Sequence, residues 1–509
     1  MLMSKSFYIT TPIYYVNDAP HMGSAYTTIS ADVAARWHRL IGDDVMFLTG
    51  TDEHGLKLQR AAEEKGMTPQ ELADFYSERF KECWKDLNIS NNDFIRTTQS
   101  RHREAVRVLL KRVYDAGYIE LGTYEGLYCV ACEAYYTEDD LVEGNCPFHN
   151  KPVEHVKEDN YFFKLSAFED KLKEYYGAHP EAIEPASRRN EVLSFIDQGL
   201  KDFSISRTSI DWGIPLPWDE RHVTYVWFDA LTNYITAIGY PKDEERFNKY
   251  WPAVHFVGKD IVRFHAIYWP AMLMAAGLEP PKKVFAHGFL TVGGEKMSKS
   301  KANQITPGDL IPTFGVDAYR YHFVSDQRFG TDGDFSYEQM VARYNSDLAN
   351  NFGNLASRVL NMAIKYCDGV SPEERSNSRL KDCIENTFKS ANDLMAEFNF
   401  SEAHATIWSL IGDVNAYIES SEPFKVAKTD MQAAKAILGD CLEALRAICL
   451  MAYPAMPDTC AELWKRLGLS EKTPIETMVL PKDIEWGSYE PGLSLEKGES
   501  LFPRIEDES

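Results

Sequence analysis

The sequence predicts an α/β protein built on a doubly wound parallel sheet, which is split by an insertion and followed by an α-helical domain. Short apolar runs typical of buried strands recur in two well-separated groups. They lie at 7–11, 45–49, 224–227, 254–257 and 284–289. Between the first two runs, Ile29, Val33 and Trp37 share one helix face, which indicates a βαβ unit. From about residue 346 to about residue 475 the apolar spacing becomes helical.

Length and composition exclude several classes of protein. A chain of 509 residues is too long for one ordinary hydrophobic core, so several domains are expected. No apolar run approaches the roughly 18 residues of a membrane helix, and no signal-peptide pattern precedes the first strand. We therefore expect a cytoplasmic location and no membrane partner. The net charge of -23 argues against a broad grip on nucleic acid, so DNA is not expected as a partner and any RNA contact must be local.

A motif after the first strand predicts one half of a nucleotide site. His21-Met22-Gly23-Ser24 opens the helix that follows this strand. A helix N-terminus offers unpaired N–H groups to phosphate, and it lies at the sheet edge where ligands of open α/β sheets bind. Gly23 lets a flat ligand approach the backbone, and His21 can donate a hydrogen bond to a phosphate oxygen.

A second motif, Lys296-Met297-Ser298-Lys299-Ser300, follows the last apolar run. Its lysines supply positive charge for a polyphosphate whose charge shifts during the reaction. A lysine-rich stretch by itself is more often a solvated surface loop, and the first motif alone is weak evidence. The two motifs in one chain favour a shared ATP site.

Both motifs resemble the signatures of the class I aminoacyl-tRNA synthetases, His-x-Gly-His and Lys-Met-Ser-Lys-Ser. The resemblance implies a Rossmann-type catalytic domain that activates an amino acid as its adenylate. Ser24 stands where the family has its second histidine, so more of the phosphate binding is expected to depend on His21 and the lysine loop. The residues implied in catalysis are His21, Gly23, Lys296 and Lys299, and ATP binding adds Ser24, Gly258 and Asp260.

Three further blocks are similar to the methionyl-tRNA synthetases, and this resemblance covers nearly the whole chain. They are Gly-Thr-Asp-Glu-His-Gly at 50–55, Tyr-Val-Trp-Phe-Asp-Ala at 225–230 and Gly-Lys-Asp-Ile-Val-Arg-Phe-His at 258–265. The resemblance implies that Asp52 pairs with the amino group of methionine. It also implies a side-chain pocket made of Ile13, Tyr15, Trp227, Ala230, Leu231, Tyr234, Phe264, His265 and Trp269. Aromatic rings make favourable contacts with thioether sulfur, although isolated aromatic residues more often serve core packing.

Asp260 directly follows a predicted strand, where a carboxylate can accept hydrogen bonds from ribose hydroxyls. A helix cap is the competing interpretation. The implied reaction needs no protein nucleophile, because the substrate carboxylate attacks the α-phosphorus of ATP, which Mg²⁺ accompanies. Positioning and charge stabilisation then carry catalysis. In the class I route, the terminal ribose 2′-hydroxyl of tRNA attacks the adenylate carbonyl.

Four residues of the predicted insertion have the spacing of a metal knuckle. Cys129 and Cys132 form one pair, and Cys146 and His149 form a second pair. This spacing is typical of a tetrahedral zinc site, whereas an odd total of nine cysteines with three clustered does not indicate a disulfide framework. Four protein ligands leave no open position, so one structural Zn²⁺ per chain is expected. Many methionyl enzymes resemble this site but have cysteine in place of His149.

Asn354 and Arg358 lie four residues apart, so they share a helix face and can together hydrogen-bond a base edge. In the methionyl family the matching residues read the anticodon, and a tryptophan farther along stacks on a base. Here Phe424 stands in the corresponding stretch, and it can stack but has no indole N–H. The competing interpretations are a helix cap for Asn354 and a solvated face for Arg358.

The resemblance implies a methionine:tRNA ligase that takes methionine, ATP and tRNA(Met), including initiator tRNA. A monomer is expected by default. The expected ranges are 1–115 and 224–295 for the two catalytic halves, 116–223 for the insertion with the zinc knuckle, 296–345 for the lysine loop and stem-contact region, 346–480 for the anticodon-binding domain, and 481–509 for a C-terminal strap and tail. Two alternatives remain open: a class I ligase for another apolar amino acid, and a noncatalytic paralogue that binds tRNA.

Overall fold

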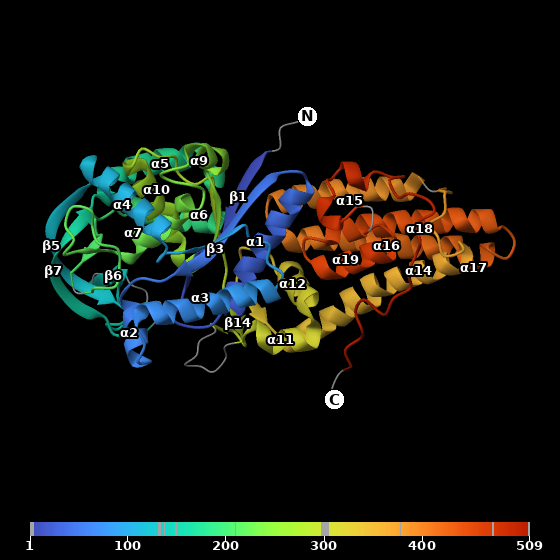
Figure 1. Cartoon of the computed structure of the whole chain (residues 1–509), viewed down its shortest axis with the longest axis horizontal. Helices are drawn as coiled ribbons and strands as arrows, with labels where there is room; N and C mark the ends of the chain where they lie inside the picture. The colour runs from blue at the N-terminus through green and yellow to red at the C-terminus, as the bar shows by residue number, and fades with distance from the viewer. Residues whose placement is uncertain are drawn as a thin grey trace.

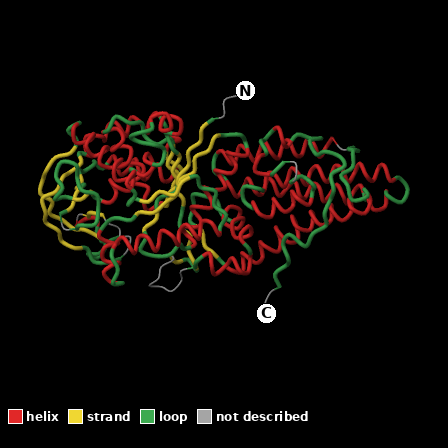
Figure 2. The backbone as a smooth tube through the Cα atoms, viewed as in Figure 1, coloured by secondary structure: helices red, strands yellow, loops and turns green. Residues whose placement is uncertain are grey.

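The computed structural model describes residues 5–130, 134–136, 138–147, 150–208, 210–296, 305–376, 378–470 and 473–506. The molecule is elongated, with the strands gathered at one end and a bundle of helices at the other (Figures 1 and 2). This arrangement confirms the predicted fold class of a parallel α/β domain followed by an α-helical domain. Within the described ranges, every helix is too short or too polar for a membrane span.

Among the described residues, seven strands form the central sheet, and every pairing in it is parallel. The first elements are β1 (Ser6–Thr10), β2 (Tyr14–Tyr15), α1 (Met22–Leu40), β3 (Asp44–Asp52), α2 (Leu56–Glu64), α3 (Pro69–Asp86), β4 (Asp93–Arg96) and α4 (Ser100–Asp115). Thr51 of β3 pairs with both Tyr14 and Arg96, so β2 extends the edge of β3 that β1 occupies, and β4 forms the opposite edge.

The second half of the chain completes this sheet. β12 pairs with β1, β13 pairs with β12, and β8 closes the far edge. The elements are β11 (Val223–Thr224), α7 (Val226–Leu231), α8 (Asn233–Thr236), α9 (Glu244–Tyr250), β12 (Val254–Gly258), a π-helix (Phe264–Tyr268), α10 (Trp269–Ala275), β13 (Lys283–His287), β14 (Leu290–Val292), β15 (Glu295–Lys296), α11 (Pro307–Phe314), α12 (Val316–Ser325), β16 (Gly333–Phe335) and α13 (Tyr337–Arg343).

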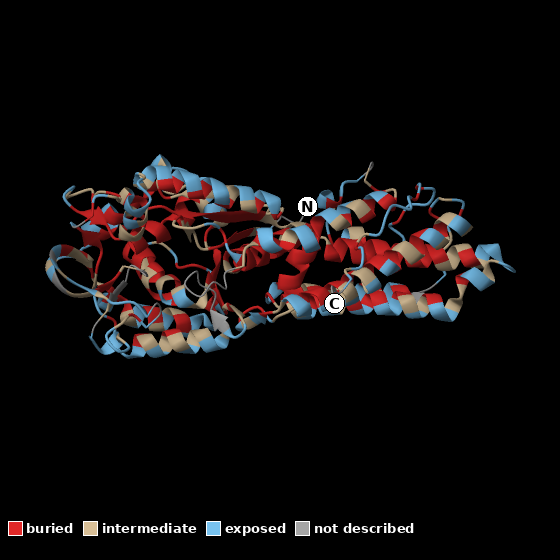
Figure 3. Ribbon diagram, turned by 90° about the horizontal axis from the view of Figure 1, so that it is seen from below, coloured by how far each residue is buried: buried red, intermediate tan, exposed pale blue. Residues whose placement is uncertain are grey.

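Both faces of the sheet are buried (Figure 3). Successive strand residues face opposite sides. Phe47 therefore enters a core covered by α1, whereas its neighbours Met46 and Leu48 enter a second core covered by α4, α7 and α10. Strands covered on two sides read as continuous apolar runs, which is why sequence patterning detects them.

Four of the five predicted strand runs are confirmed as β1, β3, β12 and β13. The prediction of a strand at 224–227 is wrong, because only Val223–Thr224 is extended and α7 begins at Val226. All residues of α7 are buried, so the segment is apolar on every side. A short continuous apolar run does not distinguish a buried strand from a buried helix.

The insertion carries an antiparallel sheet in the order β6-β5-β7-β9. The helices and strands of the insertion, within this sheet and outside it, are β5 (Ile119–Cys129), β6 (Ala134–Tyr136), β7 (Glu154–Phe163), α5 (Glu169–Ala178), β8 (Ile183–Glu184), α6 (Ala186–Asp197), β9 (Phe203–Ser204) and β10 (Ser206–Arg207). β8 lies within the range 116–223, yet it pairs with β13 of the central sheet. This stretch of chain therefore contributes to both sheets.

The helical end follows a π-helix at Tyr344–Gly353. Its helices are α14 (Asn354–Tyr366), α15 (Ser378–Ala396), α16 (Phe400–Ser421), α17 (Pro423–Val426), α18 (Met431–Ala452) and α19 (Pro457–Arg466). α18 lies at the centre, and every residue from Leu438 to its end is buried. The C-terminal segment packs on the π-helix that precedes this bundle, since Tyr344 Oη donates to the carbonyl oxygen of Pro503 at 2.9 Å.

A buried charge joins the two ends of the molecule. Asp32 of α1 is fully buried and accepts hydrogen bonds from Arg36 Nε at 2.8 Å and from Arg320 Nη2 of α12 at 2.7 Å. Arg320 also donates to the carbonyl oxygens of Pro454 and Ala455, between α18 and α19. Burial alone would raise the pKa of Asp32, but the two guanidinium groups hold it well below its ordinary value.

The change Asp32→Ala tests this junction. It leaves Arg320 buried without its counter-charge, and breaking a buried pair in this way costs about 3–5 kcal/mol. Chemical denaturation should show a loss of unfolding free energy of that order. As a control, Glu78→Ala breaks an exposed pair with Lys81 and should leave the denaturation midpoint unchanged. Equally small effects of both changes would contradict the assignment.

Candidate active site

The first motif caps helix α1. Nδ1 of His21 accepts a hydrogen bond from the N–H of Gly23 at 3.0 Å. Ser24 Oγ accepts from the N–H of His21 at 3.0 Å and donates to the His21 carbonyl oxygen at 2.7 Å. Because Nδ1 accepts, the proton of the neutral His21 ring lies on Nε2, which makes that atom a donor. Ser24, which stands where the synthetase signature has histidine, closes a capping box.

The second motif meets the first through the backbone. Lys296 lies in β15, where it pairs with Thr291, whereas Lys299 lies outside the described residues. The chain is described again from Ile305, whose carbonyl oxygen accepts a hydrogen bond from the N–H of Met22 at 2.9 Å. The segment that follows the second motif is therefore held against the first motif.

The carboxyl ends of the central strands supply the remaining predicted polar groups. Asp52 ends β3 and is only 4% exposed, while Gly258 ends β12. A Cβ atom at position 258 would lie 2.6 Å from Asp260 Oδ1, so a larger residue there would displace the Asp260 side chain. Asp260 is exposed and lies inside the turn Lys259–Ile261 rather than at its cap. The helix-cap interpretation of Asp260 is therefore wrong.

Ring contacts bring the predicted methionine pocket together. Trp227 of α7 stacks on Phe264, with ring centroids 3.8 Å apart and planes 6° apart. The rings of Tyr234 and Trp269 have centroids 6.2 Å apart, and both side chains are buried. The indole N–H groups of Trp227 and Trp269 are buried without a hydrogen-bond partner among the described residues. The pocket therefore joins apolar ring faces with two buried donors.

A hydrogen-bonded pair fixes one wall of this pocket. His265 Nδ1 donates to the carbonyl oxygen of Ile261 at 3.0 Å, so its Nε2 accepts from Tyr234 Oη at 2.7 Å. Burial lowers the pKa of His265 to about 4, which keeps the ring neutral at physiological pH. The hydroxyl proton of Tyr234 is used in this bond. A bound thioether would therefore meet the tyrosine ring rather than its hydroxyl.

The other predicted pocket residues come from two segments. Ala230 and Leu231 are buried on α7. Ile13 lies just before β2, and Tyr15 lies on it. Both are partly buried against the core that contains Trp227. The structure thus brings α7, α8, the π-helix, α10 and the β1–β2 stretch to one side of the sheet.

Sequence reasoning missed a buried acid–base cluster next to this pocket. Asp229 Oδ2 accepts from His54 Nδ1 at 2.6 Å, and Asp229 Oδ1 accepts from His102 Nε2 at 2.7 Å. His54 and Asp229 stand inside two of the quoted blocks, which is the only sequence signal for them. His102 of α4 carries no motif, so only the folded chain links it to the site.

The predicted metal site is only half described. Cys129 at the end of β5 and Cys146 are each 1% exposed. Cys132 and His149 lie outside the described residues. Within the part of the chain that the structure describes, no group of three or more His, Cys, Asp or Glu side chains is arranged to hold a metal.

The predicted anticodon residues lie on the helical end. α14 continues directly from the π-helix, so Asn354 stands inside a continuous helical segment, and its interpretation as a cap is wrong. Asn354 is exposed, and the half-buried Arg358 donates from Nη1 to Asn415 Oδ1 of α16 at 3.4 Å. Phe424 of α17 is 39% exposed. All three side chains reach the surface.

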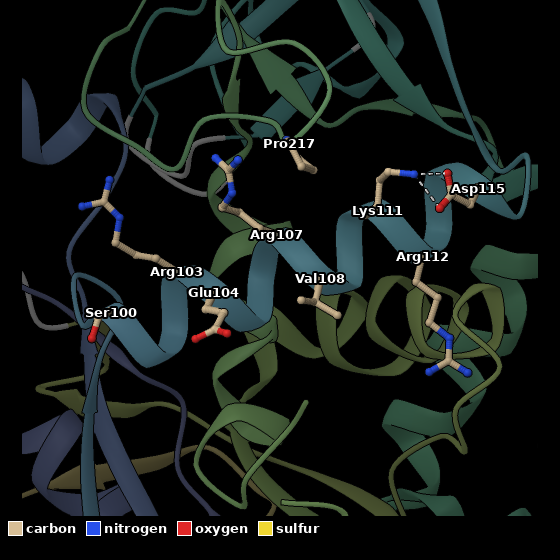
Figure 4. Close-up of a pocket in the computed structure, with 9 residues that line it drawn as sticks. All are labelled: Ser100, Arg103, Glu104, Arg107, Val108, Lys111, Arg112, Asp115 and Pro217. Atoms are coloured by element: carbon tan, nitrogen blue, oxygen red, sulfur yellow. Dashed lines mark hydrogen bonds and ion pairs between the residues drawn. The ribbon is translucent and has the colours of Figure 1, made fainter. Parts of the chain in front are cut away.

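A groove also runs along the outer face of α4 (Figure 4). It is lined by Ser100, Arg103, Glu104, Arg107, Val108, Lys111, Arg112, Asp115 and Pro217. Lys111 Nζ donates a hydrogen bond to Asp115 Oδ2, and Arg107 Nη2 lies 3.8 Å from Glu220 Oε1. None of the predicted site residues lines the groove, so it is separate from the candidate active site.

Comparison with known proteins covers nearly the whole chain. The family described as tRNA synthetases class I (M) matches residues 7–155 and 148–360. The family described as the anticodon binding domain of methionyl tRNA ligase matches residues 368–509. The two matches divide the chain close to the transition from the sheet to the helical bundle.

Individual relatives match over nearly the whole of this chain. The methionine–tRNA ligase of Streptomyces coelicolor is 48% identical and is covered over 97% of its length by 99% of this chain. The methionine–tRNA ligase of Thermotoga maritima is 47% identical, over 98% of this chain and 80% of that protein. The solved structure of the Mycobacterium tuberculosis methionyl-tRNA synthetase in complex with methionyl-adenylate aligns with a TM-score of 0.92 at 41% identity, over 98% of this chain and 100% of that one.

Proposed function

Because this chain belongs to the methionyl-tRNA synthetases of class I, we propose that it is an AMP-forming methionine:tRNA ligase. It activates methionine with ATP to methionyl-adenylate and pyrophosphate. It then transfers the methionyl group to the terminal ribose of tRNA(Met), including initiator tRNA. The bond from Met22 to Ile305 carries this proposal, because it holds the segment that follows the second motif against the first motif, at the sheet edge where Asp52 ends its strand.

The proposed ATP site combines a helix end with the lysine loop. The N-terminus of α1 directs N–H groups and a partial positive charge toward phosphate, and His21 adds its Nε2–H donor. Lys296 and Lys299 are proposed to neutralise the charge that develops on the departing pyrophosphate. Gly258 leaves room beside Asp260, whose carboxylate is proposed to accept from the ribose hydroxyls. ATP enters as its magnesium complex.

The proposed methionine site places opposite ends of the substrate on different walls. Asp52 holds the ammonium group, because a buried carboxylate pairs strongly with a cation. The rings of Trp227, Phe264, Tyr234 and Trp269 surround the thioether, which makes favourable contacts with aromatic rings. Since homocysteine lacks only one methyl group, this pocket discriminates against it by about 1–3 kcal/mol.

The chemistry follows from holding two reactants in line. An oxygen of the methionine carboxylate attacks the α-phosphorus, the bond from that phosphorus to the bridging oxygen breaks, and pyrophosphate leaves. In the second step the ribose hydroxyl oxygen of tRNA attacks the carbonyl carbon, and the bond from that carbon to the phosphate oxygen breaks. AMP departs, and the hydroxyl proton is released. Neither step forms a bond to the protein, so the residues act by orientation and by charge.

Amino-acid-dependent exchange of pyrophosphate into ATP tests this function. Methionine should stimulate the exchange without tRNA, because activation is complete before transfer. Leucine, isoleucine, valine and cysteine should give little or no stimulation, since the pocket is formed around an unbranched thioether. Stimulation by another amino acid with methionine inert would favour a class I ligase for that amino acid. No exchange with any of them would favour a noncatalytic paralogue.

We propose that Asn354, Arg358 and Phe424 read the anticodon. Their support is exposure on the helical end together with complementary chemistry: an amide and a guanidinium for base edges and a ring for stacking. The contact from Arg358 to Asn415 links α14 to α16. The region 296–345 is proposed to contact the tRNA stem.

The change Arg358→Ala should lower the kcat/KM of aminoacylation about fivefold or more, because it removes a base contact worth about 1–3 kcal/mol. Methionine-dependent pyrophosphate exchange should be unchanged, since that reaction does not use tRNA. Lys365→Ala removes an exposed positive charge from the same helix and serves as the matched control. Equal losses in aminoacylation and exchange would exclude a role in tRNA recognition.

We propose one structural zinc ion held by Cys129, Cys132, Cys146 and His149. Two observations support it. Cys129 and Cys146 are buried although the residues around Cys146 are largely exposed. The N–H of Asn150 donates to the carbonyl oxygen of Cys146 at 2.8 Å, and the N–H of Cys146 donates to that of Lys151 at 2.9 Å, so the backbone of Cys146 is held in place by two hydrogen bonds.

Protein purified without chelator should contain about one zinc per chain by elemental analysis. Cys146→Ser should lose most of the metal and lower the thermal midpoint, because folding of the insertion is coupled to metal binding. Cys367→Ser changes a buried cysteine of the helical end and should retain the zinc. Wild-type protein without zinc, or equal zinc in both variants, would refute the site.

We also propose a cytoplasmic location, because aminoacyl-tRNA is consumed by ribosomes in that compartment. The three clustered cysteines, assigned to a metal rather than to disulfides, agree with a reducing environment.

A further inference from the structure

We propose that Asp229 is a positioning residue for methionine binding. Its carboxylate holds the pocket helix α7 against the turn after β3 and against α4. It thereby sets the separation between the aromatic pocket and Asp52, which receives the amino group. This inference rests on the proposed function and names a part of the site that no sequence motif assigns a role.

The cluster uses both oxygens of the Asp229 carboxylate. Each oxygen of Asp229 accepts one imidazole N–H, from His54 Nδ1 at 2.6 Å and from His102 Nε2 at 2.7 Å. The side chains of Asp229 and His102 are fully buried, and that of His54 is 3% exposed. The remaining nitrogen of His102, Nδ1, lies 3.4 Å from Thr236 Oγ1. Three segments of the chain therefore meet at one carboxylate, and α8 joins them through His102.

The members of the cluster stand beside the pocket in a regular way. Asp229 is two residues from Trp227, and His54 is two residues from Asp52. Thr236 is two residues from Tyr234. Three of the segments that carry predicted methionine-binding residues thus also carry a member of the hydrogen-bonded cluster two residues away. A shift of any one wall would stretch bonds that converge on Asp229.

The charge of Asp229 gives this arrangement its strength. Burial disfavours the ionised carboxylate, but His54 and His102 lower the pKa of Asp229 to about 2. Hydrogen bonds to a charged group are stronger than neutral ones, and a buried charge that loses its donors is costly. The carboxylate is enclosed by its partners, and adenylate formation requires no proton transfer from the protein. Its role is therefore to orient the pocket rather than to react.

The change Asp229→Asn tests the proposal in the full-length enzyme by pyrophosphate exchange. It keeps the size of the side chain but replaces one acceptor oxygen by an NH₂ group that faces an imidazole N–H. The KM for methionine should rise about tenfold, corresponding to the loss of one hydrogen bond to a charged group. The KM for ATP should change less than about twofold, because the cluster contacts the walls of the methionine pocket and not the phosphate motifs.

Conservative variants separate positioning from packing. His102 donates from Nε2, a position that the amide nitrogen of Gln can occupy, and His54 donates from Nδ1, a position that Asn can occupy. His102→Gln and His54→Asn should therefore keep a methionine KM near that of the wild type. His102→Leu fills the same space without a donor and should raise it. If Asp229→Asn does not fold, the comparison of His102→Gln with His102→Leu still tests the proposal.

A buried carboxylate far from the pocket provides the control for stability. Glu443 of α18 is buried, and Arg446 Nη2 lies 2.7 Å from its Oε1. Glu443→Gln should lower the thermal midpoint and leave the KM for methionine unchanged. An unchanged KM in Asp229→Asn, an equal rise for methionine and ATP, or equal effects of Gln and Leu at residue 102 would overturn the proposal. Absence of methionine-dependent exchange in the wild type would instead overturn the proposed function.

Discussion

The buried charge of Asp32 constrains how the two ends of the molecule fit together. It lies in the middle of α1, whose N-terminus carries His21, and it binds Arg320 of α12. Arg320 donates to the carbonyl oxygens of Pro454 and Ala455, in the turn between α18 and α19. Because an unpaired charge in the interior costs several kcal/mol, α1 and the bundle cannot shift independently. The ATP motif and the proposed anticodon surface are therefore held at a set separation by one ion cluster.

Much of the sheet could be predicted because of how it is buried. Strands β1, β3, β12 and β13 are covered on both faces, so each leaves an unbroken apolar run in the sequence. β8 contains only Ile183–Glu184, which is too short to leave such a run. The same physical reason explains the error at α7. A fully buried helix of one or two turns is as apolar as a buried strand, and periodicity cannot separate them.

The candidate site also contains residues that could be predicted from the sequence and residues that could not. Residues joined by a local motif, such as His21 and Gly23, could be found in the sequence, and the hydrogen bond between them explains why the motif is contiguous. The cluster around Asp229 could not, because its members come from segments that meet only in the folded chain. Ser24 illustrates a third case. Comparison with a signature suggests a missing histidine, whereas the structure shows a hydroxyl that closes the cap of α1.

The hydrophobic core continues from the sheet into the bundle. Phe256 of β12 meets Phe398, just before α16, with ring centroids 4.8 Å apart and the rings nearly perpendicular. One cluster of buried side chains includes both residues. The catalytic and tRNA-reading functions thus belong to different parts of the sequence. Both parts depend on one hydrophobic core for their stability. An inherited substitution deep in the bundle can therefore lower the amount of active enzyme in a cell and mimic a defect in amino-acid activation, without altering any atom of the ATP site.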